Sequence, residues 1–330
     1  MVTSLPSRPS NSPATARNPV LAVPRELWDI ITRYRFLPEV IYGESEIVAF
    51  HEELKAMPPD APRAKHLFLG LIPDGDAEGA RKTCDSVLQG WVQGFEETDD
   101  QRAERARQNS HLSKFGKQPR QGPQYNRFVQ RDVVGGIMSY HKDSLESLTH
   151  LVVASYINFG IFGYLPNLKD LTIVCLRSDY PYYRTYFDDQ RRRQTQFPSL
   201  KRLHLSYFDT RDNFHYDEFR CLAPNLTHLR LSGRKIYPEF EKLLPHTKVF
   251  MEPMLVSSEE QQAQVSRIRD ILAVKQYRER TTLLESGHGE EGRYGFFDAL
   301  LDWLDVSAGG NAFWDVAAER TITIDELAAR

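Results

Sequence analysis

Cysteine is scarce in this chain, and its few copies are not placed for a disulfide framework or a metal site. Cys84, Cys175 and Cys221 are odd in number, lie far apart and form no CxxC or Cys/His spacing. The sequence therefore indicates neither a disulfide scaffold nor a zinc module. We expect a reducing compartment, cytoplasmic or nuclear.

Long apolar runs and an excess of basic charge are also missing. No stretch approaches the run of about 20 apolar residues that spans a bilayer, so we expect no membrane partner. The net charge of −3 argues against bulk attraction to nucleic acid. An aromatic and arginine-rich stretch at 180–193 could stack on single-stranded nucleic acid, but Asp179, Asp188 and Asp189 dilute its charge, and we interpret it as a surface loop.

The sequence also lacks the usual catalytic motifs. G-x-S-x-G, HExxH, P-loop and EF-hand patterns do not occur in it. We therefore expect a non-enzymatic protein without a cofactor or a metal. A hydrolase or transferase whose active site has no standard motif remains the alternative.

The N-terminal third is predicted to be a tail, a helical segment and an insertion. Residues 1–20 are rich in Ser, Pro, Asn and Ala and are expected to be disordered. In residues 21–60 the apolar spacing predicts one helix at 23–31 and another at 45–56. The polar stretch 96–131 has almost no large aliphatic residue and is interpreted as an exposed insertion.

The middle of the chain repeats the pattern L-x-x-L-x-[LIV], the strand half of a leucine-rich repeat. The four copies are LESLTHLVV at 145–153, LPNLKDLTI at 165–173, FPSLKRLHL at 197–205 and APNLTHLRL at 223–231. Leu151, Leu171, Leu203 and Leu229 occupy matching positions, 20, 32 and 26 residues apart. This pattern predicts an α/β fold over residues 61–255: an irregular, leucine-rich-repeat-like solenoid with a mostly parallel sheet, because each unit buries too little surface to stand alone.

Residues 256–330 are expected to cap this solenoid. A further strand is predicted at 245–251, a polar-faced helix at 257–276 and a strand at 281–284. The aromatic stretch 296–304 has helical spacing, and we interpret it as a cap on the last repeat, since a terminal unit needs a different outer face.

If the repeat leucines point inward, the residues between them form an open face. Strands about 4.8 Å apart would bring them into one stripe, which we predict to be solvent-accessible and to bind an acidic segment of a partner protein. A solvated face without function and a metal site built from its histidines are the alternatives. The stripe consists of His150, Asp170, Thr172, Arg202, His204, His228 and Arg230.

The chain resembles the F-box-like, leucine-rich-repeat proteins that are abundant in mushroom-forming fungi. The resemblance rests on VPRELWDII at 23–31, KHLFLG at 65–70, the repeats and ALLDWLD at 299–305, and loosely covers residues 21 to about 315. It implies a substrate receptor of a cullin–RING ubiquitin ligase, whose F-box docks on a Skp-type adaptor while the repeats hold a target.

The resemblance also implies which residues would contact the adaptor. By position, these are Pro24, Glu26, Leu27, Ile30 and Ile31 in the first F-box helix. The second half of the family's F-box has no counterpart, so the domain is shortened. One helix would bury little surface on an adaptor, and we expect its apolar stripe to fold back on the repeats.

Overall fold

The computed structural model describes the chain from Glu39 onward, with gaps. The described residues are 39–58, 60–61, 63–71, 82, 107, 129–152, 159–175, 195–206, 220–233, 243–253, 258–285, 294–310, 314 and 321–328. The adaptor-binding residues predicted at 24–31, the tail at 1–20 and most of the insertion at 96–131 lie outside this range.

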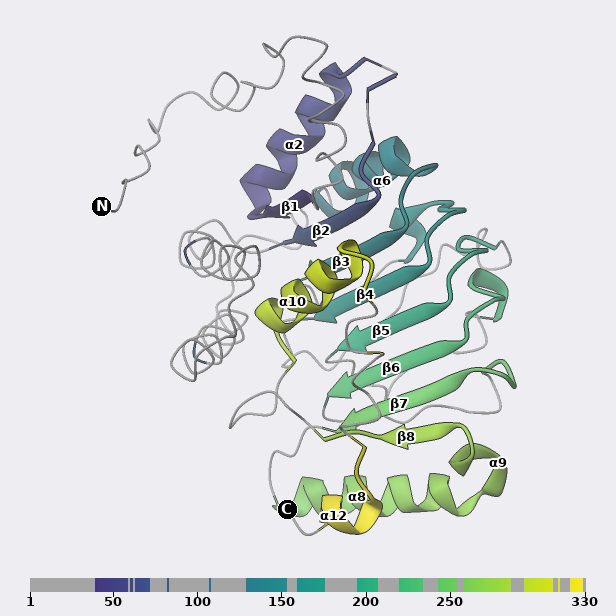
Figure 1. Cartoon of the computed structure of the whole chain (residues 1–330). Coiled ribbons are helices and arrows are strands. Elements are labelled where there is room, and N and C mark those ends of the chain that lie inside the picture. The colour runs from purple at the N-terminus through teal and green to yellow at the C-terminus, as the bar shows by residue number, and fades with distance from the viewer. Residues whose placement is uncertain are drawn as a thin grey trace.

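One parallel sheet organises the described residues. Its eight strands lie side by side in sequence order, and every neighbouring pair is parallel (Figure 1). The α/β class and the parallel sheet are thus confirmed, whereas the leucine-rich-repeat assignment stays a prediction. The strands are β1 (Glu39–Tyr42), β2 (His66–Gly70), β3 (Ser147–Val152), β4 (Asp170–Cys175), β5 (Arg202–Ser206), β6 (His228–Gly233), β7 (Lys248–Pro253) and β8 (Thr281–Leu283).

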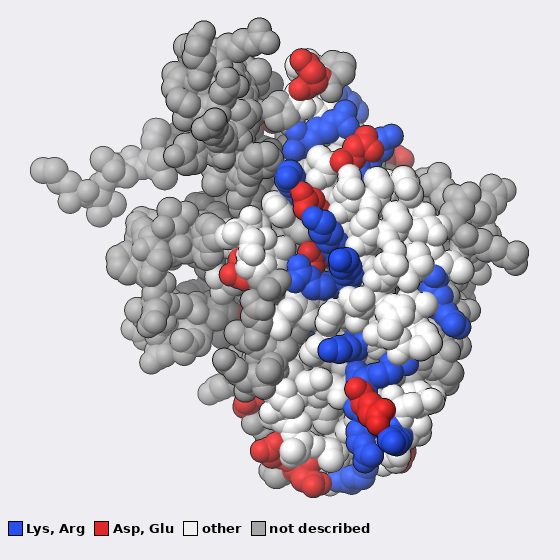
Figure 2. Space-filling model, turned by 45° about the vertical axis from the view of Figure 1, so that its right-hand side comes forward, with Lys and Arg blue, Asp and Glu red and all other residues white. Residues whose placement is uncertain are grey.

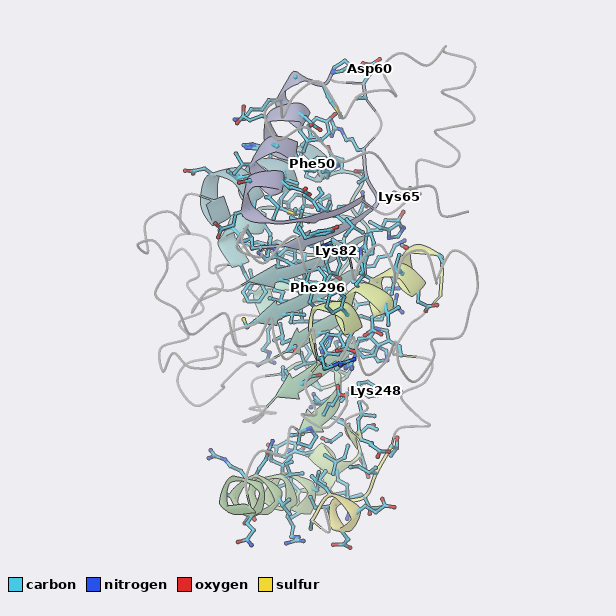
Figure 3. All side chains as sticks on the ribbon, turned by 90° about the vertical axis from the view of Figure 1, so that its left-hand side faces the viewer. Phe50, Asp60, Lys65, Lys82, Lys248 and Phe296 are labelled. Carbon is cyan, nitrogen blue, oxygen red and sulfur yellow. The ribbon has the colours of Figure 1, made fainter. Side chains whose placement is uncertain are left out.

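Helices cover both faces and one end of this sheet. The inner face, which carries the leucine rows, is covered near its first strands by α2, a π-helical turn and α6, while α10 lies on the opposite, outer face (Figure 3). Beyond β8 lie α8 and α12 (Figure 1). The bounds are α2 (Glu44–Ala56), η2 (Val129–Val134), α6 (Gly135–His141), η3 (Phe159–Phe162), α8 (Ser258–Ala273), α9 (Lys275–Arg278), α10 (Phe296–Ser307) and α12 (Ile324–Ala328).

Two rows of buried side chains, apolar except for His150, run across the inner face and build the larger core. In the first row each leucine pairs with the next along the sheet: Leu67, Leu148, Leu171, Leu203 and Leu229. All of these are at most 1% exposed. The second row consists of Leu69, His150, Ile173, Leu205, Leu231 and Met251.

The register of the first repeat differs from the prediction by three residues. Leu148, not Leu151, pairs with Leu171, and Leu151 pairs with Val174. The segment is the one copy without a proline at its second position, and its leucines recur every third residue, at 145, 148 and 151, so a shift by three residues still places leucines at two of the apolar positions of the repeat. In the fold, α6 leads directly into it, with Leu145 N–H bonded to the His141 carbonyl. Because a shift by an odd number exchanges the two faces, Leu151 points outward.

The same shift moves His150 from the predicted open face into the core. It is 0% exposed, and its ring meets Phe162 edge-on at 5.5 Å. Burial lowers the pKa of His150 to about 4, so the imidazole is neutral at physiological pH.

The segment boundaries also need correction. Residues 39–42 form β1, so part of the segment predicted to be helical belongs to the sheet. Likewise β8, placed in the cap, is the last strand of the sheet. Helix α10 does not cap the last repeat, because it packs over β2, β3 and β4.

We predict that replacing His150 with Ile, the residue beside it on β4, reduces the loss of stability in acid. The folded-state pKa lies below the unfolded value of 6.5, so protons bind the unfolded chain preferentially as the pH falls from 6.5 towards 4. Between pH 7.5 and 5 the variant should lose about 2 kcal/mol less unfolding free energy than the wild type, measured by urea unfolding. An equal loss in both proteins would contradict the buried, neutral histidine.

Candidate recognition site on the outer face of the sheet

Helix α10 is held on the outer face by aromatic packing. Phe68 of β2 contacts Phe296 at 5.3 Å and Trp303 at 5.6 Å between ring centroids. Gly70 permits this approach, since a Cβ there would lie 2.8 Å from the Phe296 ring. The helix thereby buries one part of the outer face and leaves a pocket beside it.

This outer-face pocket lies between the middle strands and α10. Its volume is about 30 Å³, which is room for roughly two water molecules. The strands contribute Ser147, Leu148, Thr149, Asp170, Leu171, Thr172, Arg202, His204 and Arg230, and the C-terminal region contributes Asp302, Trp303, Val306 and Trp314.

Asp170 and Arg202 form an ion pair at this pocket. They are register partners on β4 and β5, and the guanidinium donates through both Nε and Nη2, the latter at 2.8 Å, to the two carboxylate oxygens. Their side chains are 15% and 22% exposed. A planar, two-point pair of this kind fixes the Arg202 side chain against the sheet.

Arg230 is buried, although the sequence pattern predicted it to be accessible. Its side chain is 1% exposed and donates to Glu252 Oε2 at 2.8 Å and to Asp302 Oδ2 at 3.0 Å. The Tyr294 ring lies 4.6 Å from its guanidinium carbon. Register places Arg230 on the outer face, but α10 brings Asp302 across it, so the residue anchors the helix rather than facing solvent.

His204 and Ser232 continue this buried network. Ser232 Oγ donates to Glu252 Oε2 at 2.8 Å, so the serine accepts the hydrogen bond that joins it to His204 Nε2 at 2.9 Å. A nucleophilic serine would have to give its proton to the histidine. In this Ser–His pair the histidine donates and the serine accepts, which is the opposite of the direction that a nucleophilic serine needs. His204 also packs against Tyr294, whose ring lies 4.4 Å away.

The structure brings together five of the seven predicted open-face residues at the pocket: Asp170, Thr172, Arg202, His204 and Arg230. His228 lies nearby and packs on Phe250 and Trp314 at 5.9 and 5.5 Å. His150 is on the other face, so the histidines cannot share a metal ion. Among the described residues no cluster of three or more His, Cys, Asp or Glu fits a metal.

The sequence does not predict the C-terminal half of the pocket. Asp302 and Trp303 belong to the aromatic stretch that was assigned to a cap. That apolar stretch contains two acidic residues, Asp298 and Asp302, of which Asp302 pairs with Arg230. No sequence pattern shows that the helix returns to the early strands.

A band of basic side chains runs along the edge where the strands begin. Figure 2 shows Lys and Arg gathered down this side of the molecule, and Lys65 and Lys248 mark two points far apart along it in Figure 3. Backbone hydrogen bonds align Lys65, Glu146, Lys169 and Lys201 in one row. We define the basic band as Arg63, Lys65, Lys169, Lys201, Arg202 and Lys248.

Acidic residues neutralise the basic band only in part. Glu146 contacts Lys169 at 2.5 Å and Lys65 at 3.1 Å, and the hydrogen bond from Lys169 lowers its pKa. Asp143 lies 3.6 Å from Arg63. Lys201 and Lys248 are exposed and extend the positive edge past the pocket. The band therefore keeps a local positive excess on a chain of net charge −3.

We predict that Arg230→Met destabilises the fold by about 3–5 kcal/mol, because it leaves buried Glu252 without its counter-charge. Arg202→Met is the control; its pair is partly solvated and should cost about 1 kcal/mol. Adding Glu252→Gln to Arg230→Met should recover part of the loss. Urea unfolding measures all three, and equal midpoints for the two arginine variants would refute the anchoring role.

The comparisons with known proteins leave the family open. No protein-family model matches the chain, and no curated protein or solved structure is significantly similar to it. None of the helices in the described ranges combines the length and apolar character that a bilayer span requires.

Proposed function

We propose that this protein is a recognition module that binds an acidic segment of a partner protein on the outer face. The observation that carries the proposal is that Arg202 belongs both to the basic band and to the lining of the outer-face pocket, so that band and pocket meet at one edge of the sheet. Neighbouring strands of a sheet lie about 4.8 Å apart, so an extended segment that crosses the strands would meet a positive side chain on several of them. A leucine-rich-repeat-like origin of the strands is part of this proposal.

Screening determines how such a partner would bind. At physiological salt charges act over about 8 Å, so the acidic segment must dock directly on the band. Exposed lysines contribute little to folding, which leaves them available for binding. The alternative, a hydrolase or transferase, would need a reactive group at the pocket, and the His204–Ser232 pair is not arranged to supply one.

We predict that the double variant Lys201→Glu/Lys248→Glu weakens binding of a labelled hexaglutamate peptide at least tenfold, since each reversal replaces an attraction by a repulsion at the band. Affinity of the wild type should fall as salt rises. The control is Lys275→Glu, a charge reversal at a residue of α9 that is not part of the band and whose side chain is 81% exposed. Fluorescence anisotropy measures binding, and equal affinity of all three proteins would refute the band as the binding surface.

A narrower form of the proposal makes the module a substrate receptor of a cullin–RING ligase. It rests on the resemblance of residues 23–31 to an F-box helix, with Leu27, Ile30 and Ile31 as the adaptor-facing stripe. The receptor would then hold its target on the outer face while the N-terminal helix contacts the adaptor.

Because one helix buries little surface, we predict weak capture of the wild type on an immobilised Skp-type adaptor. Leu27→Asp should instead lower the thermal midpoint, as expected for an apolar stripe folded against the repeats. Arg25→Asp, a charge change in the same segment, is the control. Tight capture that Leu27→Asp abolishes would establish the ligase-receptor role and contradict the folded-back helix.

A further inference from the structure

We infer that the outer-face pocket is the subsite for one Asp or Glu side chain of the acidic segment, held through its carboxylate. This inference rests on the proposed function and names the contact that would give it specificity. The basic band attracts negative charge along the whole edge, but an attraction of that kind cannot distinguish one acidic side chain from the next. A pocket with hydrogen-bonding groups can.

The pocket is large enough for the end of a side chain but not for a larger ligand. Its volume of about 30 Å³ holds roughly two water molecules, too little for a nucleotide, a sugar or another metabolite. The two oxygens of a carboxylate would replace two waters. The remaining methylene groups would lie along the apolar wall formed by Val306 and Trp314.

The polar groups of the pocket match a carboxylate. Thr149 and Thr172 are register partners on β3 and β4, so their side chains lie next to each other on the outer face. A hydroxyl can donate to a carboxylate oxygen. Arg202 stands one strand further, and a guanidinium in a planar fork can be shared between two carboxylates, here Asp170 and the incoming one.

Trp303 adds a donor that lacks an acceptor. Its Nε1 is buried and has no hydrogen-bond partner within the described part of the chain, which costs free energy in the unbound protein. Trp303 lines the pocket. A small rotation of the indole towards an entering carboxylate would satisfy Nε1–H.

The positive charge of the basic band favours an acidic over a neutral side chain at the pocket. At the pocket the two guanidinium groups of Arg202 and Arg230 face three carboxylates, those of Asp170, Glu252 and Asp302, so these ion pairs by themselves do not attract a further negative charge. The basic band at its rim supplies the preference for the charged side chain. A glutamate is therefore expected to bind and a glutamine, of the same shape, is not.

Indole resonances of the full chain test the inference. Four tryptophans give four indole signals in a ¹H–¹⁵N spectrum, and Trp303→Phe identifies the signal of Trp303. Hexaglutamate should shift the Trp303 signal saturably, and hexaglutamine should leave it in place. Thr172→Val should weaken hexaglutamate binding about tenfold. Thr282→Val, on the same face at β8, is the matched control and should bind as the wild type.

The outcomes separate this inference from the proposed function. If hexaglutamate binds with an unmoved Trp303 signal and equal affinity for Thr172→Val, the pocket holds only water; the subsite is then refuted and the basic band stands. If the wild type does not bind hexaglutamate at all, both the subsite and the acidic-segment proposal fail.

Discussion

Parallel pairing of the strands in sequence order is the constraint on which the rest of this structure depends. Each strand continues the register of the one before it, so a residue's position within its repeat decides both its row and its face. Leucines at matching positions then form one continuous inner core without any strand having to stand alone. A shift of one strand by an odd number of residues exchanges its two faces. For this reason Leu151 points outward and His150 inward in the observed register.

Helix α10 covers part of the outer face and sets the position of the side chains beneath it. Aromatic residues of α10 bury Phe68 and Leu151 in a second core, and the same helix brings Asp302 over Arg230. A buried ion pair is weak evidence for stability, because desolvation offsets the attraction. Here the ion pair fixes the position of α10. Arg230 can pair with Glu252 and Asp302 together only when α10 lies at this place on the outer face, and the same placement fixes the α10 wall of the pocket.

Local periodicity was sufficient to predict the sheet but not the site. The L-x-x-L-x-L spacing states directly which side chains alternate into a core, so the parallel strands at 170–175, 202–206 and 228–233 follow from the sequence. The first copy, with leucines every third residue and no proline, fits two registers, and only the preceding helix α6 decides between them. The return of α10 to β2–β4 depends on contacts more than 120 residues apart in sequence, such as Leu151 with the α10 core. No local pattern encodes such contacts.

The repeat spacing joins the core to the proposed recognition surface. In Leu168-Lys169-Asp170-Leu171 and Leu200-Lys201-Arg202-Leu203, two polar residues stand between two buried leucines. The leucines hold the turn and the strand start, so the residues between them must lie at the strand-entry edge. These positions supply Lys169, Lys201 and Arg202 to the basic band. Because their side chains do not enter the core, substitutions there change the charge of the edge at little cost in stability. The same spacing that makes the sheet fold thus leaves its edge free to acquire a partner.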